Sequence, residues 1–430
     1  MSTRLVIRRT RALRGTTRVP GDKSISHRAL ILGALAAGEN RVRGWLAAGD
    51  TLATLDAMRA LGVTVRRERD VLLFHGGKLR APAGPIDCRN AGTALRLLAG
   101  LLVGQPFPSV LDGSAQLRRR PMRRIVEPLC QMGADLAAAG GHAPLHVRPA
   151  PLHGIRYRLP VASAQVKSAL LLAGLHAQGE TEVVEPGPAR DHTERMLQAM
   201  GADLRVDGQT IAVAGGRALQ PLDMTIPGDF SSAAFLVVGA LLAPGSAVTV
   251  ADVGLNQTRT GLVDILQRMG ADCRGQTQRQ ECGEDVGTIA VRSQPLRGTH
   301  VAGGDVVRAI DELPILSVAA TQAAGETTIR DAAELRAKEV DRIAVVAAEL
   351  RKLGARITEL PDGMIVAGQA QLQGTIVDSH GDHRLGMALA VAGLVAAGET
   401  VVEGAACIED SFPSFARTLG ELGADVRADE

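Results

Sequence analysis

The sequence predicts an α/β fold made of six copies of one unit and divided into two domains. At 430 residues the chain exceeds the size at which a single hydrophobic core keeps growing. Two patterns alternate along it, an apolar helix followed by a strand and an amphipathic helix followed by a strand, with a period of roughly 70 residues. Six such units are most simply two domains of three, each a ring of small sheets around buried helices.

The first pattern is a few small or polar residues, an apolar run, a glycine and a β-rich segment. "GDKSISHRALILGALAAGENRVRG" and "GDHRLGMALAVAGLVAAGETVVEG" are two examples, and the six runs close at Gly38, Gly104, Gly179, Gly245, Gly325 and Gly398. Helices that are apolar nearly all round are buried on all sides. We therefore expect the first helix of each unit to lie in a domain core.

The second pattern is an amphipathic helix that ends at a glycine and passes into an alternating strand, as in "LDAMRALGVTVRR". The glycines stand at the C′ position, which favours a left-handed residue, and they are Gly62, Gly133, Gly201, Gly270, Gly354 and Gly423. With one polar face, these helices should lie outside. An open solenoid is the alternative, but solenoids need atypical terminal repeats and the last unit is like the others.

Two "PGD" stretches, at Pro20 and Pro227, mark unit starts about three units apart, and Pro next to Gly suits a hinge. We place the domain boundaries there. The first domain would span residues 20–227, and the second would combine residues 1–19 with residues 228–430. The first 19 residues would then pair back with the second half of the chain.

Composition excludes several classes of protein. The net charge is only +2 and aromatic residues make up 2%, so neither a polyanion binder nor a base-stacking surface is expected, and "LRRRPMRR" is a single basic cluster. A Gly-rich P-loop is absent. The N-terminus lacks the apolar core of a signal peptide, and the longest apolar runs are too short to span a bilayer. We expect a soluble, cytoplasmic monomer that binds neither nucleic acid nor membrane.

Cysteine and histidine spacing gives no sign of a metal or a disulfide framework. The five cysteines are far apart and form no CxxC, so we expect buried free thiols. Four histidines stand near polar helix starts without forming a ligand pattern, namely His27, His192, His380 and His383. We expect no metal and no cofactor.

The starts of the six buried helices carry hydrogen-bonding residues, which are Ser24 and Ser26, Asn90 and Thr93, Ser163 and Gln165, Ser231 and Ser232, Asp311, and Asp382. Helix N-termini have free N–H groups and a positive dipole end, and so favour anions. Cations recur at the same turns of the repeat: Lys23, Arg28, Arg120, Arg190, Lys338, Arg342 and Arg384. Two domains facing each other would aim these groups at one cleft, suited to phosphates and carboxylates.

Two carboxylates stand among those cations, Asp311 in "AIDELPILS" and Glu339 in "AKEVD". An aspartate at a helix start is often only a cap, and Pro314 in the first turn is consistent with that role. The alternative is general acid and base work, which needs carboxylates held near cations and a substrate hydroxyl. Spacing alone does not choose between them.

The motifs resemble those of one enzyme family over nearly the whole chain and in order. "PGDKSISHRAL", "NAGTALRLL", "RRRPM", "SAQVKSALLLAGL", "RDHTERML", "PGDFSSAAF", "LRAKEVDRI" and "GDHRLGMA" are similar to those of the 5-enolpyruvylshikimate-3-phosphate (EPSP) synthases. The resemblance implies a two-domain inside-out α/β barrel, the enolpyruvyl transferase fold. Its six βαβαββ repeats would be split three to a domain, with the active site in the interdomain cleft.

The resemblance also implies a reaction and a site without cofactor. The enolpyruvyl group of phosphoenolpyruvate would pass to the 5-hydroxyl of shikimate 3-phosphate with loss of phosphate, a step of the shikimate pathway to chorismate and aromatic amino acids. Shikimate 3-phosphate would be bound by Lys23, Ser24, Arg28, Ser163, Ala164, Gln165, Arg190, Asp311 and Lys338. Phosphoenolpyruvate would be bound by Lys23, Gly92, Arg120, Gln165, Arg342 and Arg384. Asp311, Glu339 and Lys23 would carry the proton transfers.

Two other functions stay open at this point. The first is the sister activity on UDP-N-acetylglucosamine, whose enzymes typically have a cysteine in the loop that here reads "DGSAQLRRRPM". The second is a non-catalytic anion-binding repeat protein, which would keep the cations but would have no need of Asp311 and Glu339. Among the family's positions, Ala164 stands where many members have a second serine.

Overall fold

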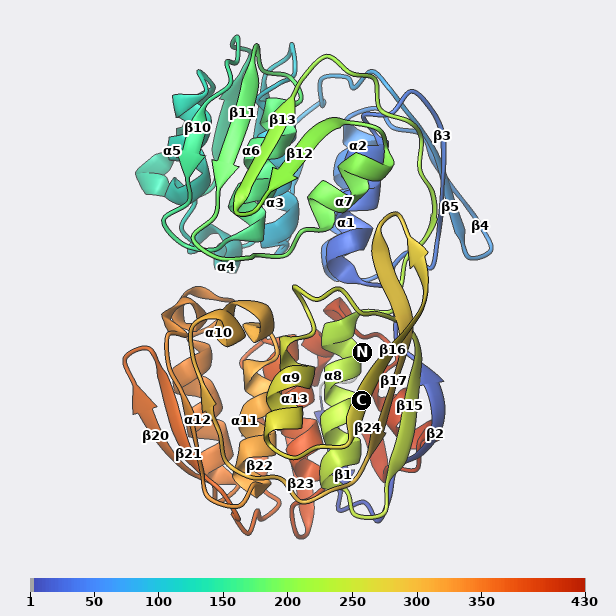
Figure 1. The fold of residues 1–430 in the computed structure, drawn as a ribbon, viewed down its shortest axis with the longest axis vertical. Coiled ribbons are helices and arrows are strands. Elements are labelled where there is room, and N and C mark those ends of the chain that lie inside the picture. Colours follow the sequence, from blue (N-terminus) through green and yellow to red (C-terminus); the bar gives the residue numbers. More distant parts are fainter. Residues whose placement is uncertain (1–3, 430) are drawn as a thin grey trace. The chain divides into compact units, whose positions relative to one another are not determined.

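The computed structural model describes residues 4–429, which divide into two compact units (Figure 1). The first unit contains residues 21–226 together with residues 280–284. The second contains the described residues 4–20, 227–279 and 285–429. Residues 280–284, which the sequence places in the second domain, therefore cluster with the first unit.

Three buried helices form the core of the first unit, α1 (Lys23–Gly33), α3 (Gly92–Leu102) and α6 (Ala164–Gly174). The amphipathic helices are α2 (Gly49–Ala60), α5 (Arg123–Gln131) and α7 (His192–Ala199), and two short helices are α4 (Ala115–Arg118) and the 3-10 helix η1 (Ala139–Gly141). Helices α3 and α6 approach closely at Gly100, where a Cβ atom would lie 2.2 Å from the carbonyl oxygen of Ala169. Only glycine permits that approach.

Three four-stranded sheets belong to the first unit, in the orders β14-β3-β5-β4, β6-β7-β9-β8 and β10-β11-β13-β12. Their strands are β3 (Gly38–Arg43), β4 (Val65–Glu68), β5 (Val71–Gly76), β6 (Ile86–Asp87), β7 (Ser109–Asp112), β8 (Asp135–Ala138), β9 (Leu145–Arg148), β10 (Arg156–Arg158), β11 (Glu180–Val184), β12 (Asp203–Asp207), β13 (Thr210–Ala214) and β14 (Asp223–Thr225). The last strand, β14, pairs in parallel with β3, the first, and so closes the ring of repeats.

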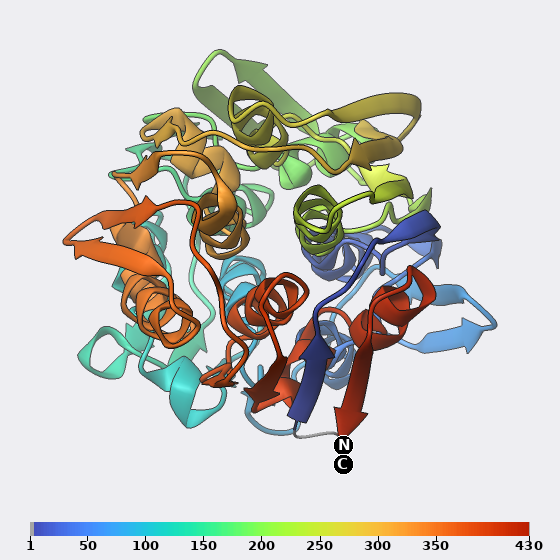
Figure 2. The same cartoon turned by 90° about the horizontal axis from the view of Figure 1, so that it is seen from below.

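The second unit repeats this plan around α8 (Phe230–Leu242), α11 (Leu313–Gln322) and α13 (His383–Gly393), which contact one another in the middle of the unit (Figure 2). Every residue from Phe230 to Leu241 is buried, as the uniformly apolar pattern predicts. The outer helices are α9 (Gly261–Arg268), α12 (Arg342–Lys352) and α14 (Phe415–Glu421), with three short ones, α10 (Gly304–Ala309), η2 (Ala333–Ala337) and η3 (Ala405–Asp410).

The sheets of the second unit are ordered β16-β17-β15-β2, β18-β19-β21-β20 and β22-β23-β1-β24. Their strands are β1 (Arg4–Arg8), β2 (Arg14–Arg18), β15 (Ala247–Gly254), β16 (Cys273–Glu281), β17 (Glu284–Arg292), β18 (His300–Val301), β19 (Glu326–Ile329), β20 (Arg356–Leu360), β21 (Gly363–Ala367), β22 (Ile376–Asp378), β23 (Glu399–Glu403) and β24 (Val426–Asp429). The N-terminal segment is built into these sheets, since β1 lies between β23 and β24 and β2 pairs in parallel with β15.

The glycines predicted to end the amphipathic helices all adopt left-handed backbone conformations. Their φ angles are +88° at Gly62, +94° at Gly133, +80° at Gly201, +95° at Gly270, +95° at Gly354 and +105° at Gly423. An L residue with a side chain is strained at such angles. The six-fold repetition of this turn therefore follows directly from the sequence.

The predicted helix caps are only partly correct. The predicted Ser163 and Asp382 accept hydrogen bonds from the first-turn N–H groups of α6 and α13, whereas in α8 the cap is Asp229 and not Ser231 or Ser232. In α1 the cap is Asp22, not Ser24 or Ser26. In α11 the N-cap residue is Glu312 without a side-chain cap, so Asp311 does not cap the helix.

The cysteines are all unpaired, but the expectation that they are buried is wrong for Cys130, which is exposed on α5. Cys88 and Cys273 are buried, and Cys282 and Cys407 are half-buried. None of the helices formed by residues 4–429 combines the length and the apolar character needed to span a membrane.

His27, buried in α1, is expected to make the fold sensitive to acid. Its Nδ1 lies 2.6 Å from Thr54 Oγ1, and burial lowers its pKa from 6.5 to about 3, against the attraction of Asp50. Between pH 6.5 and pH 3 this histidine is protonated in the unfolded chain but stays neutral in the folded chain. Neutral His27 therefore contributes its full stabilisation only above pH 6.5. It is lost as pH falls toward 3, by about 1.4 kcal/mol per pH unit.

The measurement is the free energy of unfolding in urea between pH 7 and pH 4. Replacing His27 with glutamine should flatten the acid slope, whereas replacing the exposed His153 in the same way should leave it unchanged. An identical slope in the His27→Gln variant would contradict the assignment.

Candidate functional site

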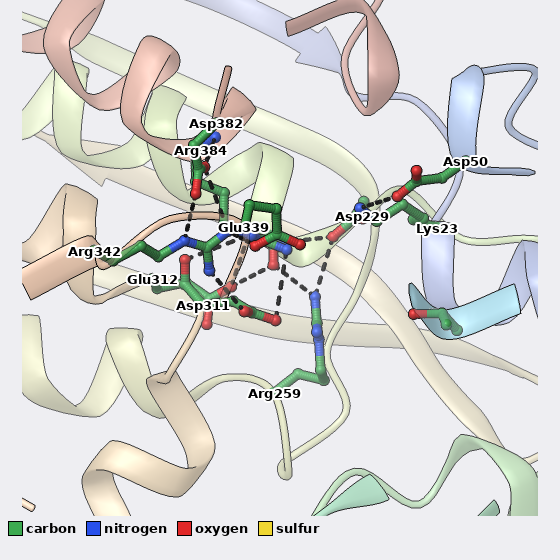
Figure 3. A network of polar contacts seen from close by, with 12 residues as sticks. Lys23, Asp50, Asp229, Arg259, Asp311, Glu312, Glu339, Arg342, Asp382 and Arg384 are labelled. Atoms are coloured by element: carbon green, nitrogen blue, oxygen red, sulfur yellow. Dashed lines mark hydrogen bonds and ion pairs between the residues drawn. The ribbon is translucent and has the colours of Figure 1, made fainter. Parts of the chain in front are cut away.

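A buried guanidinium gathers three carboxylates in the second unit (Figure 3). Arg342, the first residue of α12, is 1% exposed. Its Nε donates to Asp382 Oδ2 at 2.7 Å, its Nη2 donates to Glu339 Oε2 at 2.7 Å, and its Nη1 donates to Asp311 Oδ1 at 3.3 Å. Burial acts to lower the Arg342 pKa, but the three carboxylates outweigh it and raise the pKa above its ordinary value. Arg342 is therefore permanently charged and fixes three side chains from separate segments.

The three carboxylates differ in access to solvent. The Asp382 side chain is fully buried and also caps α13, so its pairing with Arg342 is structural. The side chains of Asp311 and Glu339 are 13% and 18% exposed. Asp311 and Glu339 are therefore the two carboxylates of this cluster that a bound molecule could reach.

A second arginine completes the surroundings of Asp311. Arg384, near the start of α13, lies with Nη2 3.5 Å from Asp311 Oδ2 and donates from Nη1 to the Asp311 carbonyl oxygen at 3.3 Å. Glu312 is fully buried, accepts a hydrogen bond from the Ser231 hydroxyl, and lies 3.8 Å from Arg384 Nη1. The segment that carries Asp311 is thus held from several sides.

Lys338 lies beside this cluster and is half-buried. Burial lowers the pKa of its ammonium, opposed by the attraction of Asp311 and Glu334. With Arg342 and Arg384 it adds a third positive charge next to the reachable carboxylates. Such a mixed cluster can bind an anion and move a proton at the same place.

In the first unit, Arg28 is the centre of a buried hydrogen-bond network. It is 3% exposed and donates from Nε to Thr193 Oγ1 at 2.7 Å, from Nη2 to Ser168 Oγ at 2.8 Å and from Nη1 to the Ser24 carbonyl oxygen at 3.0 Å. Burial lowers its pKa to about 10, against the attraction of Glu194. Arg28 is therefore rigid and charged at neutral pH.

Lys23 begins α1 and is held by a carboxylate of α2. Its Nζ lies 3.1 Å from Asp50 Oδ2, and the two side chains are 14% and 19% exposed. Because both groups are partly accessible, Lys23 remains available to a ligand while Asp50 restricts where its ammonium lies. The half-buried Arg190 precedes α7, and its charge contributes to lowering the Arg28 pKa, which places the two cations near each other.

The start of α6 carries Ser163, Ala164 and Gln165. The Ser163 hydroxyl caps the helix by accepting from the N–H of Val166 at 3.5 Å. Gln165 accepts from Arg96 Nη1 at 2.6 Å and donates to Thr93 Oγ1 at 2.9 Å, so its amide has a fixed orientation.

Gly92 begins α3 and lies against two guanidinium groups. A Cβ atom at this position would lie 2.8 Å from Arg120 Nη1 and 3.1 Å from Arg96 Nη1. The glycine therefore leaves these cations room to point along the helix start. Arg120 itself is 9% exposed.

The predicted residues of the second unit are thus brought together, whereas those of the first unit lie in smaller local groups. Asp311, Lys338, Glu339, Arg342 and Arg384 form one cluster in the second unit. The first unit holds the remaining predicted residues, which are Lys23, Ser24, Arg28, Gly92, Arg120, Ser163, Ala164, Gln165 and Arg190. Two predicted cations lie at the starts of outer helices and not of the buried helices where we expected them. Arg190 stands before α7, and Arg342 is the first residue of α12.

Sequence reasoning missed several residues that hold the predicted ones in place. The sequence analysis did not identify Asp50, Arg96, or the buried residues Lys167, Glu185 and Glu194. The lysine inside the apolar run "SAQVKSALLLAGL" is nevertheless a signal that buried acceptors must be present. Within residues 4–429 no group of three or more His, Cys, Asp or Glu is placed to hold a metal ion.

Comparison with known proteins gives one consistent result. A family model described as EPSP synthase (3-phosphoshikimate 1-carboxyvinyltransferase) matches residues 7–419. The chain is 52% identical over 425 residues, covering 98% of each chain, to the 3-phosphoshikimate 1-carboxyvinyltransferase of Acidithiobacillus ferrooxidans. It is 51% identical over 417 residues to that of Geobacter sulfurreducens, covering 96% of this chain and 97% of the other.

Solved structures agree with these sequence matches. The EPSP synthase of Acinetobacter baumannii superposes with a TM-score of 0.89 at 42% identity, covering 99% of this chain and all of the other. The enolpyruvyl transferase NikO of Streptomyces tendae superposes with a TM-score of 0.81 at 20% identity, covering 99% of each chain, which shows a shared fold.

Proposed function

Because the chain belongs to the EPSP synthase family, its activity is 3-phosphoshikimate 1-carboxyvinyl transfer, and we propose that the residues described above perform it. The reaction moves the enolpyruvyl group of phosphoenolpyruvate to the 5-hydroxyl of shikimate 3-phosphate and releases phosphate. The observation that carries the residue assignment is the pair of reachable carboxylates, Asp311 and Glu339, held by the buried Arg342.

Asp311 is proposed as the base that removes the proton of the 5-hydroxyl. Its carboxylate is anchored by Arg342 and Arg384 but remains 13% exposed, so it combines a fixed orientation with access to a ligand. A general base must lie within hydrogen-bond reach of the proton it takes, which favours a rigidly held group. The two arginines also offset the negative charge of an incoming anion.

Glu339 and Lys23 are proposed to handle the protons of phosphoenolpyruvate. Protonation of the methylene carbon makes the neighbouring carbon electrophilic, and the 5-oxygen then attacks that carbon to give a tetrahedral adduct. Departure of phosphate with its bonding electron pair, and loss of a proton from the new methyl group, regenerate the carbon–carbon double bond. Lys23 can transfer a proton to the departing phosphate, and fixed cations stabilise both the adduct and the leaving group.

The predicted residues are proposed to bind the two substrates as follows. Lys23, Ser24, Arg28, Ser163, Ala164, Gln165, Arg190, Asp311 and Lys338 would contact shikimate 3-phosphate. Phosphoenolpyruvate would meet Lys23, Gly92, Arg120, Gln165, Arg342 and Arg384. The rigid anchoring of Arg28 and Gln165 supports a binding role for both, because a preorganised donor loses little entropy on binding.

The testing experiment is phosphate release from the purified chain mixed with both substrates and no added metal. We expect release that depends on shikimate 3-phosphate as well as on phosphoenolpyruvate. Release with UDP-N-acetylglucosamine but not with shikimate 3-phosphate would favour the sister activity. Binding of both ligands without any release would favour a non-catalytic anion-binding protein.

A Gly92→Ala variant tests the phosphoenolpyruvate assignment. The new methyl group would displace the ends of two flexible side chains, Arg120 and Arg96, while the helix backbone stays as it is. Stability should change little, and the KM for phosphoenolpyruvate should rise about 10-fold or more, since small misplacements of a binding group have large effects.

Steady-state kinetics with each substrate varied in turn measures this effect. Gly84→Ala is the matched control, because no atom lies within 4 Å of a Cβ at that position. An unchanged KM for phosphoenolpyruvate in Gly92→Ala would contradict the assignment of Gly92 to its binding.

We also propose that the protein is active as a monomer. Light scattering during size-exclusion chromatography should give the mass of a monomer at concentrations where the enzyme is active. A dimer that loses activity on dilution would contradict this.

A further inference from the structure

Lys167 is a charged residue buried in the apolar core of the first unit. It lies in the second turn of α6, its side chain is 1% exposed, and the residues that follow it, Ser168 to Gly174, are all buried. A lysine in such a place is costly unless each of its N–H groups has a partner. Its contacts should therefore reveal what it holds.

The ammonium of Lys167 has three acceptors. Its Nζ lies 2.9 Å from Glu185 Oε2 and 2.6 Å from Glu194 Oε1, and it donates to the carbonyl oxygen of Ala189 at 3.3 Å. Glu185 and Glu194 are themselves 5% and 3% exposed. An ammonium has three donors, so this arrangement matches its capacity.

These acceptors bracket the segment that carries Arg190. Glu185 follows strand β11, Glu194 lies in the first turn of α7, and Ala189 is the neighbour of Arg190 in the chain. Glu185 also accepts from the Ala189 N–H at 3.3 Å, so the peptide groups around Ala189 are held on both sides. The loop from residue 185 to residue 194 is thus fixed at its two ends and near its middle.

Ser168, the next residue of α6, extends the same connection to Arg28. Its hydroxyl lies 2.6 Å from Thr193 Oγ1 and accepts from Arg28 Nη2 at 2.8 Å. Two adjacent residues of α6 therefore bind two adjacent residues of α7, Thr193 and Glu194. Helix α6 therefore has two links to the start of α7, which follows Arg190, and one link to Arg28 through Ser168.

We propose that Lys167 is a positioning residue for shikimate 3-phosphate, acting by fixing the loop that places Arg190. The inference rests on the proposed role of Arg190 in binding that substrate. An uncharged core residue could fill the same volume, but it could not hold Glu185, Glu194 and the Ala189 carbonyl oxygen at once. The buried charge is therefore explained by the loop that it orders.

The test is a Lys167→Met variant, compared with Lys352→Met, which removes a half-exposed lysine of α12. In Lys167→Met the KM for shikimate 3-phosphate should rise about 10-fold or more, because the loop no longer holds Arg190 in place. The KM for phosphoenolpyruvate and kcat should stay within about 3-fold of the parent, since no group that reacts is changed. Lys352→Met should match the parent in all three constants.

Lys167→Met leaves two buried carboxylates facing each other, so a neutral triple variant guards against misfolding. K167M/E185Q/E194Q removes all three charges with little change in volume and lacks the N–H donors of Lys167. The thermal midpoint of each variant reports whether it is folded. A folded variant with an unchanged KM for shikimate 3-phosphate would overturn the proposal, as would equal losses in both KM values and kcat.

An Arg190→Ala variant separates this proposal from the one it rests on. If Lys167 acts through Arg190, Lys167→Met should add little to the KM for shikimate 3-phosphate in the Arg190→Ala background. Fully additive effects would overturn the positioning role. If Arg190→Ala alone leaves that KM unchanged, the assignment of Arg190 fails, and with it this route for Lys167.

Discussion

Replacement of Asp311 with asparagine is expected to lower kcat by about 10²- to 10⁴-fold, the range contributed by a positioned general base. Asparagine has nearly the same shape and can still accept from Arg342, so the cluster should keep its geometry. It cannot take the proton of the 5-hydroxyl. Binding of shikimate 3-phosphate, measured by calorimetry, should persist because Arg28 and its hydrogen-bond partners are untouched.

The Glu339→Gln variant should show a comparable loss if Glu339 supplies the methylene proton. Asp425→Asn, which changes an exposed aspartate of the second unit, is the matched control and should keep the kcat of the parent.

Full activity in Asp311→Asn would remove Asp311 from proton transfer. Equal losses of shikimate 3-phosphate binding and kcat would leave Asp311 with a binding role alone.

The repeat architecture could be predicted from the sequence because it depends on local patterns. Apolar runs without a polar face predict buried helices, and six glycines after amphipathic helices predict left-handed turns such as those at Gly62 and Gly354. Each signal lies within one repeat and occurs six times in the sequence. Residues 280–284 are the exception, since their clustering with the first unit depends on contacts with residues distant in the sequence and not on a local pattern.

The partners of the site residues could not be predicted, because they lie in different elements that are far apart in the sequence. Arg342 binds Asp382, 40 positions away, and Lys23 binds Asp50, 27 positions away. Sequence spacing identifies the cations but not which carboxylate each one meets. For the same reason Asp311 could not be distinguished from a helix cap until Glu312 was seen to occupy the cap position of α11.

Lys167 is a signal in the sequence that indicates buried partners. A single lysine in an apolar helix must find buried partners, and the later "VVEPGPARDHTE" supplies them in Glu185 and Glu194. A lysine expected to be buried therefore indicates that partners for its charge must be present, even where sequence spacing does not identify them.

Replacement of Arg342 with methionine should have the largest effect on stability, because three carboxylates would lose their common partner. Asp382 is fully buried, so its charge would remain without compensation in the core. Removing one partner of a buried ion pair costs about 3–5 kcal/mol of unfolding free energy. Urea unfolding should measure that loss at neutral pH, and phosphoenolpyruvate turnover should disappear with it.

Arg351→Met is the control on the same helix and should cost less, since Arg351 loses only a surface pair with Glu359 and hydrogen bonds to the Ile357 carbonyl oxygen, and leaves no buried carboxylate uncompensated. The stability deficit of Arg342→Met should shrink as pH falls, because proton uptake by the carboxylates relieves their repulsion. Arg342→Lys keeps the charge but lacks the planar fork that reaches Asp311, Glu339 and Asp382 together, so it should recover stability more than turnover. Equal recovery of both would mean that Arg342 acts as a simple positive charge and not as the group that orients the two reachable carboxylates.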